Sequence, residues 1–127
     1  MLVARFSLLG EHGAVWFAIA VAARRWDAAR TVAIAYGANQ LVKVLVRRRR
    51  PPREDRRAHT LSDLSYPSAH AATSVAGARA LSTTLPPAPL WGLAAALALS
   101  RLYLGVHYPS DTVAGAALGG AIAELTR

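Results

Sequence analysis

The stretch from Ser100 to Asp111, SRLYLGVHYPSD, decides how the chain folds and what it can do. An apolar helical run ends near Ser100, and a new helix is expected behind Pro109, because proline is tolerated in a first helical turn. Asp111 then lies one turn beyond His107, where its carboxylate can hold one imidazole nitrogen and leave the other free as a nucleophile or base. Arg101 adds a cation whose planar fork suits phosphate oxygens. A buried His–Asp pair that only ties two helices together explains this stretch equally well.

The composition limits the class of protein only loosely. The 127 residues suffice for one domain, which we expect to span residues 1–127. A hydrophobic content of 54% and a mean hydropathy of +0.26 lie between a soluble protein and a small membrane protein. The absence of cysteine excludes disulfides and thiolate metal sites. The net charge of +8 is local, since seven of the fifteen basic residues lie in Arg47–Arg57, which argues against a nucleic-acid-binding face.

Five apolar stretches predict a helical bundle. They are Gly13–Ala23, Thr31–Val46, an alanine-rich segment from Tyr66 to about Leu85, Leu90–Leu99 and Thr112–Ala123. Most of their uncharged runs are about twelve residues, below the roughly 20 of a spanning helix, so hydropathy alone leaves a soluble bundle open. Flanking polar residues that face a site would lengthen these helices enough to span a bilayer. We therefore expect an all-α integral membrane bundle of about five helices, with the active site at one end.

Two local patterns have more than one interpretation. Gly115 and Gly119 have the GxxxG spacing, which permits close helix contact in lipid and equally tight core packing in water. The charged loop Arg47–Ser65 fits a solvated linker or a patch that binds lipid headgroups. Met1–His12 has no small-residue cleavage site after a long apolar core, so we expect no cleaved signal peptide.

A count of alternating helices places the polar residues at one end of the bundle. The exit of the second helix, the entry of the third, the exit of the fourth and the entry of the fifth all fall on the same side. The residues at these positions are Lys43, Arg50, Ser68, His70, Arg101, His107 and Asp111. Histidines, cations, a hydroxyl and a helix N-terminus at one end describe an oxyanion pocket with a nucleophile, for which phosphate is the natural anion.

Three spaced motifs resemble those of a known family. They are Lys43, six residues, then Arg50-Pro51; Pro67-Ser68-Ala69-His70; and Ser100-Arg101, five residues, His107, three residues, Asp111. In this order they resemble the signature motifs of the type 2 phosphatidic acid phosphatases, or lipid phosphate phosphatases, which are related to vanadium haloperoxidases and glucose-6-phosphatase. The resemblance covers residues 43–111 by motif and the whole chain by helix pattern.

The resemblance implies a role for each motif residue. His107 would attack phosphorus and form a phosphohistidine, with Asp111 orienting its ring, and His70 would protonate the leaving alkoxide and then activate water. The groups expected to hold the phosphoryl oxygens are those of Lys43, Arg50, Ser68, Ala69 and Arg101. Ala69 departs from the family's usual glycine, and since alanine keeps the backbone N–H at a small steric cost, we expect it to affect the rate more than the function.

No metal site or cofactor is expected. The cations already supply the charge that phosphoryl transfer requires. The sequence has no His-x-x-x-His or comparable close pair. His12 and His59 match no motif, and we assign them no chemistry.

We therefore expect an enzyme that hydrolyses a phosphate ester or anhydride on a membrane lipid, such as phosphatidate, phosphatidylglycerol phosphate or a polyprenyl phosphate derivative. One alternative is a non-catalytic helical membrane protein that binds anionic lipid through its basic loop. Another is a vanadate-dependent peroxidase. The expected partners are the lipid phosphate substrate and the bilayer, with a homo-oligomer also possible and no nucleic acid.

The expected location is the inner, or plasma, membrane, as a multi-pass protein whose active site faces the cytoplasm. With five alternating helices, the active-site side carries eight arginines, Arg5 and those in Arg47–Arg57. The opposite side carries four, which are Arg24, Arg25, Arg30 and Arg127. The excess favours a cytoplasmic site under the positive-inside rule. Many members of the family that the sequence resembles present their site on the outside, so the two observations disagree.

Overall fold

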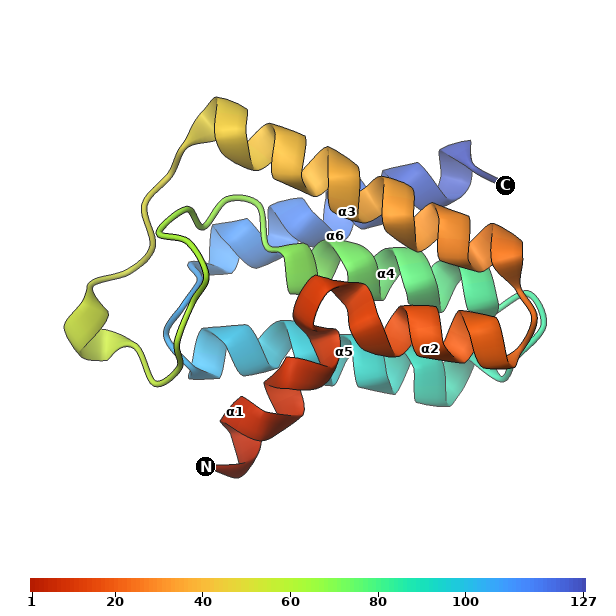
Figure 1. Cartoon of the computed structure of the whole chain (residues 1–127), viewed down its shortest axis with the longest axis horizontal. Coiled ribbons are helices and arrows are strands. Elements are labelled where there is room, and N and C mark those ends of the chain that lie inside the picture. Colours follow the sequence, from red (N-terminus) through yellow and green to blue (C-terminus); the bar gives the residue numbers. More distant parts are fainter.

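The computed structural model describes all residues, 1–127, as a bundle of helices without a sheet (Figure 1). The helical elements are α1 (Leu2–Ser7), η1 (Leu8–Gly13), α2 (Ala14–Ala22), α3 (Trp26–Val46), η2 (Arg53–Asp55), α4 (Ala69–Leu81), α5 (Pro87–Tyr103) and α6 (Pro109–Leu125). The elements α1, η1 and α2 form one broken first helix, so the chain runs along the bundle five times. The predicted all-α bundle of about five helices is therefore confirmed.

Several predicted boundaries were wrong by a few residues. The helix α6 does begin at Pro109, as predicted from proline's tolerance of a first turn. The helix α3 begins at Trp26 rather than Thr31, because Arg25 and Asp27 pair at 2.6 Å beside the helix start and Asp27 lies in the first turn, where a carboxylate is favourable. The first predicted apolar stretch began at Gly13, whereas helical structure already begins at Leu2, with α1 and η1.

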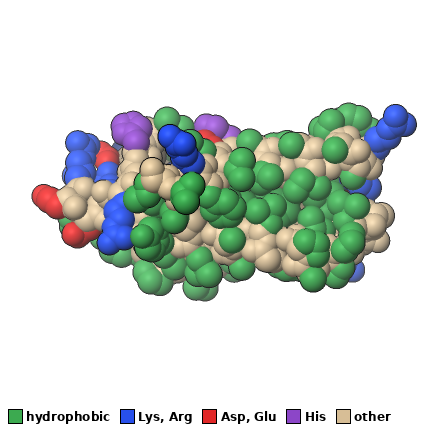
Figure 2. All heavy atoms as spheres, turned by 90° about the horizontal axis from the view of Figure 1, so that it is seen from below, with side chains coloured by type: hydrophobic (Ala, Val, Ile, Leu, Met, Phe, Trp, Pro, Cys, Tyr) green, Lys and Arg blue, Asp and Glu red, His purple; other side chains and the backbone are tan.

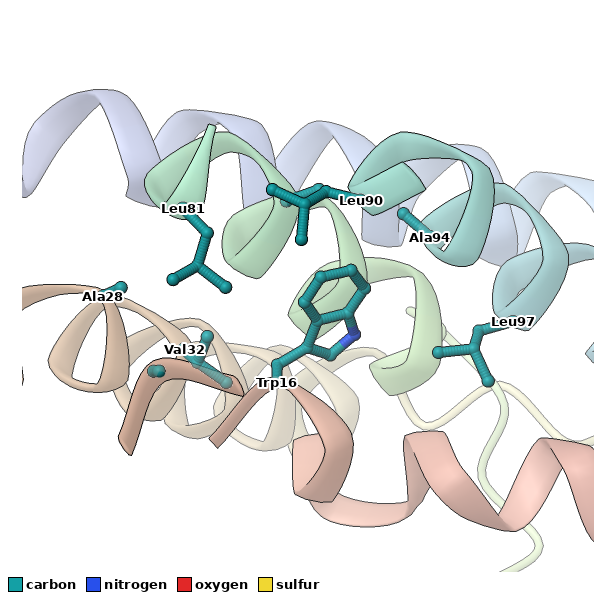
Figure 3. Close-up of a cluster of buried hydrophobic side chains, with 9 residues drawn as sticks. Trp16, Ala28, Val32, Leu81, Leu90, Ala94 and Leu97 are labelled. Carbon is teal, nitrogen blue, oxygen red and sulfur yellow. The ribbon is translucent and has the colours of Figure 1, made fainter. Parts of the chain in front are cut away.

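The hydrophobic core fills the half of the bundle away from the charged loop. Trp16 of α2 is fully buried among Val32 of α3, Leu81 of α4 and Leu97 of α5 (Figure 3). Its indole N–H donates to the Ser74 hydroxyl at 3.0 Å, so the one polar atom of this large side chain is satisfied inside the core. This cluster holds α2, α3, α4 and α5 together.

The alanine-rich helix α4 lies in the middle of the bundle, flanked by the other long helices (Figure 1). Its side chains are mostly small and buried, which lets neighbouring backbones approach closely. Gly115 and Gly119 of α6 face α4, where an added Cβ would collide with the carbonyl oxygens of Ser68 and Ala72. The GxxxG spacing therefore serves the close contact of α4 with α6.

The outer surface is apolar over the length of the helices. Figure 2 shows hydrophobic side chains along the middle of the molecule and charged side chains gathered toward its ends. Large exposed hydrophobic residues come from several helices and include Val21, Leu41, Leu45, Trp91, Leu99 and Val113. By length and composition, the broken helix Leu2–Ala22 is the one candidate membrane span. An apolar girdle of this kind is typical of a surface that contacts lipid or another protein.

The contact between α4 and α6 generates the first prediction. Gly119→Val should lower the free energy of unfolding by roughly 2–4 kcal/mol, because the new side chain must push α6 away from Ala72. Thermal unfolding of the purified protein in detergent measures the change. Gly37→Ala is the matched control, since a Cβ at Gly37 meets nothing within 4 Å and should leave stability unchanged or slightly raised. Equal midpoints for the two variants would contradict the close packing.

Candidate active site

A cavity of about 130 Å³ opens at the end of the bundle where α3 and α5 end and α4 and α6 begin. Six of the eight residues predicted from the sequence line it, namely Lys43, Arg50, Ala69, His70, Arg101 and His107. Asp111 lies behind His107, and Ser68 lies behind Ala69. The structure thus brings together residues that are far apart in the sequence, at the end of the bundle that the helix count predicted.

His107 lies in the connector between α5 and α6, between the carboxylate of Asp111 and the guanidinium of Arg50. Its Nδ1 is 3.5 Å from a carboxylate oxygen of Asp111, and its Nε2 is 3.2 Å from a guanidinium nitrogen of Arg50. A guanidinium can only donate, so Nε2 must carry the lone pair and Nδ1 the proton. Burial, aided by the cations of Arg50, Arg101 and Lys43, lowers the pKa of His107 to about 4 against the opposing pull of Asp111. The imidazole is therefore neutral near pH 7, with Nε2 available as a nucleophile.

Asp111 is fully buried and is approached from three directions, two of them by hydrogen bonds. Besides facing His107, it accepts the backbone N–H of Tyr108 at 2.8 Å, which also closes the start of α6. Its second oxygen accepts from Arg48 at 3.0 Å. Arg48 was not predicted from the sequence, because within the run of four arginines only Arg50 has the family spacing to Lys43 and a following proline.

Three cations surround the cavity without a carboxylate partner. Lys43, Arg50 and Arg101 form no salt bridge, although Lys43 and Arg101 are buried and only 8% and 6% exposed. Burial and the neighbouring Arg101 and Arg56 lower the pKa of Arg50 to about 10, where it remains charged near pH 7. Buried cations are ordinarily paired, so this cluster is complementary to a bound anion.

The loop between α3 and α4 folds over the cavity and carries Arg50. The Arg50 side chain donates to the carbonyl oxygens of Ser62 at 2.7 Å and Val106 at 2.9 Å, which fixes its guanidinium beside His107. Arg53 and Arg56 both pair with Asp63 at 3.2 Å, and their N–H groups lower the pKa of that carboxyl. Much of the loop's charge is therefore used to hold its own fold.

His70, near the start of α4, is held by the first helix. Its Nε2 lies 2.8 Å from the carbonyl oxygen of Ser7, which accepts the N–H, and the Ser7 hydroxyl accepts from Arg101 at 3.0 Å. One residue of α1 therefore positions two side chains of the cavity. Ser7 was not predicted from the sequence, because Met1–His12 carries no motif.

Ser68 and Ala69 have different environments. The Ser68 hydroxyl is fully buried and accepts the backbone N–H of Ala71 at 3.3 Å, as an N-cap of α4. The structure places Ser68 outside the cavity lining, whereas Ala69 at the first position of α4 lines the cavity. The free N–H groups of this helix start lie beside the cations.

No group of three or more histidine, cysteine, aspartate or glutamate side chains gathers anywhere in the chain. His12 is hydrogen-bonded through Nδ1 to the Tyr36 hydroxyl at 2.7 Å and lines the cavity, which the sequence analysis did not foresee. His59 lies in the charged loop, where it lines a separate surface hollow with arginines.

Comparison with known proteins gives consistent matches. Residues 24–127 match the family model described as the PAP2 superfamily. The chain is 45% identical, over 86% of its length and 67% of the relative's, to a decaprenylphosphoryl-5-phosphoribose phosphatase from Mycolicibacterium smegmatis. It is 42% identical to an undecaprenyl-diphosphatase from Sulfolobus acidocaldarius, over 51% of this chain and 33% of that protein. The crystal structure of a transmembrane PAP2-type phosphatidylglycerolphosphate phosphatase from Bacillus subtilis has the same fold, with a TM-score of 0.68, 24% identity and coverage of 98% and 73% of the two chains.

The lowered pKa of His107 predicts a pH-dependent stability. The unfolded chain binds a proton at His107 near its ordinary pKa of 6.5, whereas the folded chain binds it only near 4. Because the unfolded state then holds more protons, stability should be lost as the pH falls from about 6.5 toward 4. The thermal midpoint in detergent should drop more steeply over this range for the wild type than for His107→Asn. His59→Asn controls for the loss of a loop histidine, and identical slopes for wild type and His107→Asn would refute the assignment.

Proposed function

Because this chain belongs to the PAP2 superfamily, we propose that it hydrolyses a phosphate ester or anhydride on a membrane lipid through a phosphohistidine intermediate. The observation that carries the proposal is the neutral His107, with its Nε2 held beside three cations that have no carboxylate partner. Phosphoryl transfer depends mainly on positioning and on stabilising charge over three oxygens, and this arrangement supplies both.

The named relatives narrow the range of substrates. The mycobacterial relatives are named for a decaprenyl-linked phosphoribose and the archaeal relative for undecaprenyl diphosphate. Among the expected lipids, these names favour a polyprenyl phosphate derivative over phosphatidate. All of these relatives are named as phosphatases, which supports catalysis over a lipid-binding protein without activity and over a peroxidase.

In the first half of the proposed reaction, Nε2 of His107 attacks phosphorus and the bond from phosphorus to the lipid oxygen breaks. His70 must enter this step as the imidazolium; it gives one proton to the leaving oxygen and becomes neutral, while the phosphoryl group stays on His107. Asp111 stabilises the positive charge that develops on the His107 ring, in the manner of the carboxylate in other His–Asp pairs. Arg50 must release Nε2 and turn its N–H groups to the incoming phosphate.

In the second half, His70 takes a proton from a water molecule as that water attacks the phosphohistidine. The bond from phosphorus to His107 Nε2 breaks, inorganic phosphate leaves, and both histidines return to their initial states. Lys43, Arg50 and Arg101 and the backbone N–H groups near Ala69 hold the phosphoryl oxygens throughout. For Ser68, whose hydroxyl oxygen already accepts from Ala71, we propose that N-capping of α4 is its main contribution.

We propose that the chain crosses the inner membrane several times. The helix α3 has 21 residues, which corresponds to about 31 Å of helix and matches the hydrocarbon thickness of a bilayer. The helices α5 and α6 each have 17 residues, at the lower limit of a span. The apolar surface along the middle of the bundle and the charges toward its ends fit a transmembrane orientation (Figure 2).

The nucleophile provides a direct test. His107→Ala should abolish phosphate release, whereas Asp111→Asn should give a folded enzyme slowed by roughly 10⁴-fold, because the ring loses its orienting carboxylate. Phosphate release from polyprenyl phosphate derivatives in detergent measures both effects. Leu41→Ala changes an exposed side chain of α3 and serves as the control with normal turnover. Normal turnover by His107→Ala would exclude the proposed intermediate.

The membrane orientation is tested by labelling. We propose that the active site faces the cytoplasm, because eight arginines lie at that end, Arg5 and those in Arg47–Arg57. The other end carries the four arginines counted from the sequence, Arg24, Arg25, Arg30 and Arg127, and a fifth, Arg79, in the last turn of α4. The chain has no cysteine of its own, so His59→Cys in the exposed loop gives a single reporter.

In intact cells, His59→Cys should resist a membrane-impermeant maleimide and react only after permeabilisation. Ala88→Cys, exposed at the opposite end of the bundle, is the matched control and should react in intact cells. The reverse pattern would place the active site on the outside.

A further inference from the structure

The cavity has a second wall, which contains none of the residues proposed for catalysis. Tyr36 and Gln40 form its α3 side, on the same face of that helix as the phosphate-binding Lys43, since the three residues are separated by four and three positions. Tyr36 lies seven residues before Lys43, or about 10 Å farther along α3 toward the middle of the bundle. Glu11 and His12 of η1 complete this wall.

The second wall is a connected polar network. Gln40 donates from Nε2 to the Tyr36 hydroxyl at 2.9 Å, and that hydroxyl is hydrogen-bonded to Nδ1 of His12 at 2.7 Å. The rings of His12 and Tyr36 meet edge to face at 5.6 Å, which fixes both. The side-chain oxygen of Gln40 and Nε2 of His12 make no hydrogen bond within the chain and remain available to a ligand.

Glu11 gives this wall a charge opposite to that of the catalytic end. Its carboxylate is half-buried, lines the cavity and forms no salt bridge. A carboxylate repels a phosphate placed directly against it but accepts hydrogen bonds from hydroxyl groups. The cavity therefore orients a substrate with its phosphate toward Lys43, Arg50 and Arg101 and an uncharged, hydrogen-bond-donating group toward Glu11.

A break in the first helix places Glu11 and His12 in this wall. The first helix breaks at Glu11, whose ψ is 126°, and His12 takes a left-handed conformation with φ of 52° before Gly13 at 74°. A left-handed conformation at a residue other than glycine is costly and persists where the surrounding structure requires it. Here the break turns Glu11 and His12 toward the cavity beside α3.

The second wall lies farther along α3 than the phosphate-binding cations, on the side toward the middle of the proposed bilayer. The hydrocarbon tail of a lipid substrate must come from that side. Polar side chains at that depth are costly unless they serve a ligand or pathway. A lipid with its phosphate directly on the hydrocarbon would place apolar atoms against this wall, leaving its polar atoms unpaired.

We propose that Glu11, His12, Tyr36 and Gln40 form a subsite for a hydroxylated leaving group, a sugar or polyol that stands between the scissile phosphate and the lipid tail. The subsite assigns a substrate class to the proposed phosphatase and rests on that function. The hydroxyls of the leaving group donate to the Glu11 carboxylate and the Gln40 oxygen while the phosphate binds the cations.

The test compares lipids that differ in the leaving group. Three substrates in detergent are used: a polyprenylphosphoryl pentose phosphate, phosphatidylglycerol phosphate, and phosphatidate, whose leaving alcohol has no free hydroxyl. The wild type should show kcat/KM at least tenfold higher for a hydroxylated substrate than for phosphatidate. The first two substrates distinguish a sugar from a glycerol subsite.

Tyr36→Phe and Gln40→Leu should each lower kcat/KM for the preferred hydroxylated substrate about tenfold, the value of one hydrogen bond. The same variants should stay within about twofold of the wild type on phosphatidate, because that lipid offers the wall no donor. Leu41→Ala, on the same helix but exposed at the bundle surface, is the matched control and should leave all three values unchanged. Thermal midpoints confirm that each variant is folded.

Each other outcome overturns the subsite. Equal losses on all three lipids would mean that Tyr36 and Gln40 support catalysis or folding, and no loss on any lipid would mean that they do not contact substrate. A wild type without preference for hydroxylated lipids would also overturn it while leaving the phosphatase intact. Failure of the proposed function is separate, because the wild type would then release phosphate from none of the three.

Discussion

The close contact of α4 with α6 is the constraint on which the rest of the structure depends. Gly115 and Gly119 let the backbone of α6 approach the carbonyl oxygens of α4, and the backbone N–H of Ser68 donates to the carbonyl oxygen of Asp111 at 2.9 Å. This bond fixes the starts of the two helices relative to one another. His70 follows one start and His107 precedes the other, so the glycines of α6 set the positions of both proposed catalytic histidines.

The active-site end gathers charge that the fold alone does not neutralise. Lys43, Arg50 and Arg101 repel one another, and burial together with these cations lowers the pKa of His107 so that its imidazole is neutral. A bound phosphate relieves this repulsion, so ligand binding should stabilise the folded chain by mass action. The opposite half of the molecule has an uncharged apolar core, in which the buried Trp16 packs α2 against α3, α4 and α5 (Figure 3). Stability therefore comes chiefly from one half of the bundle and reactivity from the other.

The first helix contributes to the cavity although it precedes the residues that match the family model. The family match covers residues 24–127, whereas Ser7, Glu11 and His12 lie before it. Ser7 holds His70 and Arg101 in place, and Glu11 and His12 form part of the second wall of the cavity. In the proposed function, residues 24–127 supply the reacting groups, while the first helix holds His70 and Arg101 and lines the proposed leaving-group subsite.

The sequence by itself determined the family, the helical class and the end of the bundle at which the motif residues meet. Motif spacing and alternating helices are properties of the chain order, and the match to the PAP2 superfamily confirms the resemblance. Only the tertiary structure decided that Ser68 caps α4, that Arg48 shares Asp111, and that Ser7, Glu11 and His12 reach the cavity. Those contacts join segments up to 94 residues apart, as between Ser7 and Arg101, and depend on a helix break at His12. Hydrophobic periodicity encodes which face of a helix is buried, but the distances across a bundle follow from how closely its helices pack.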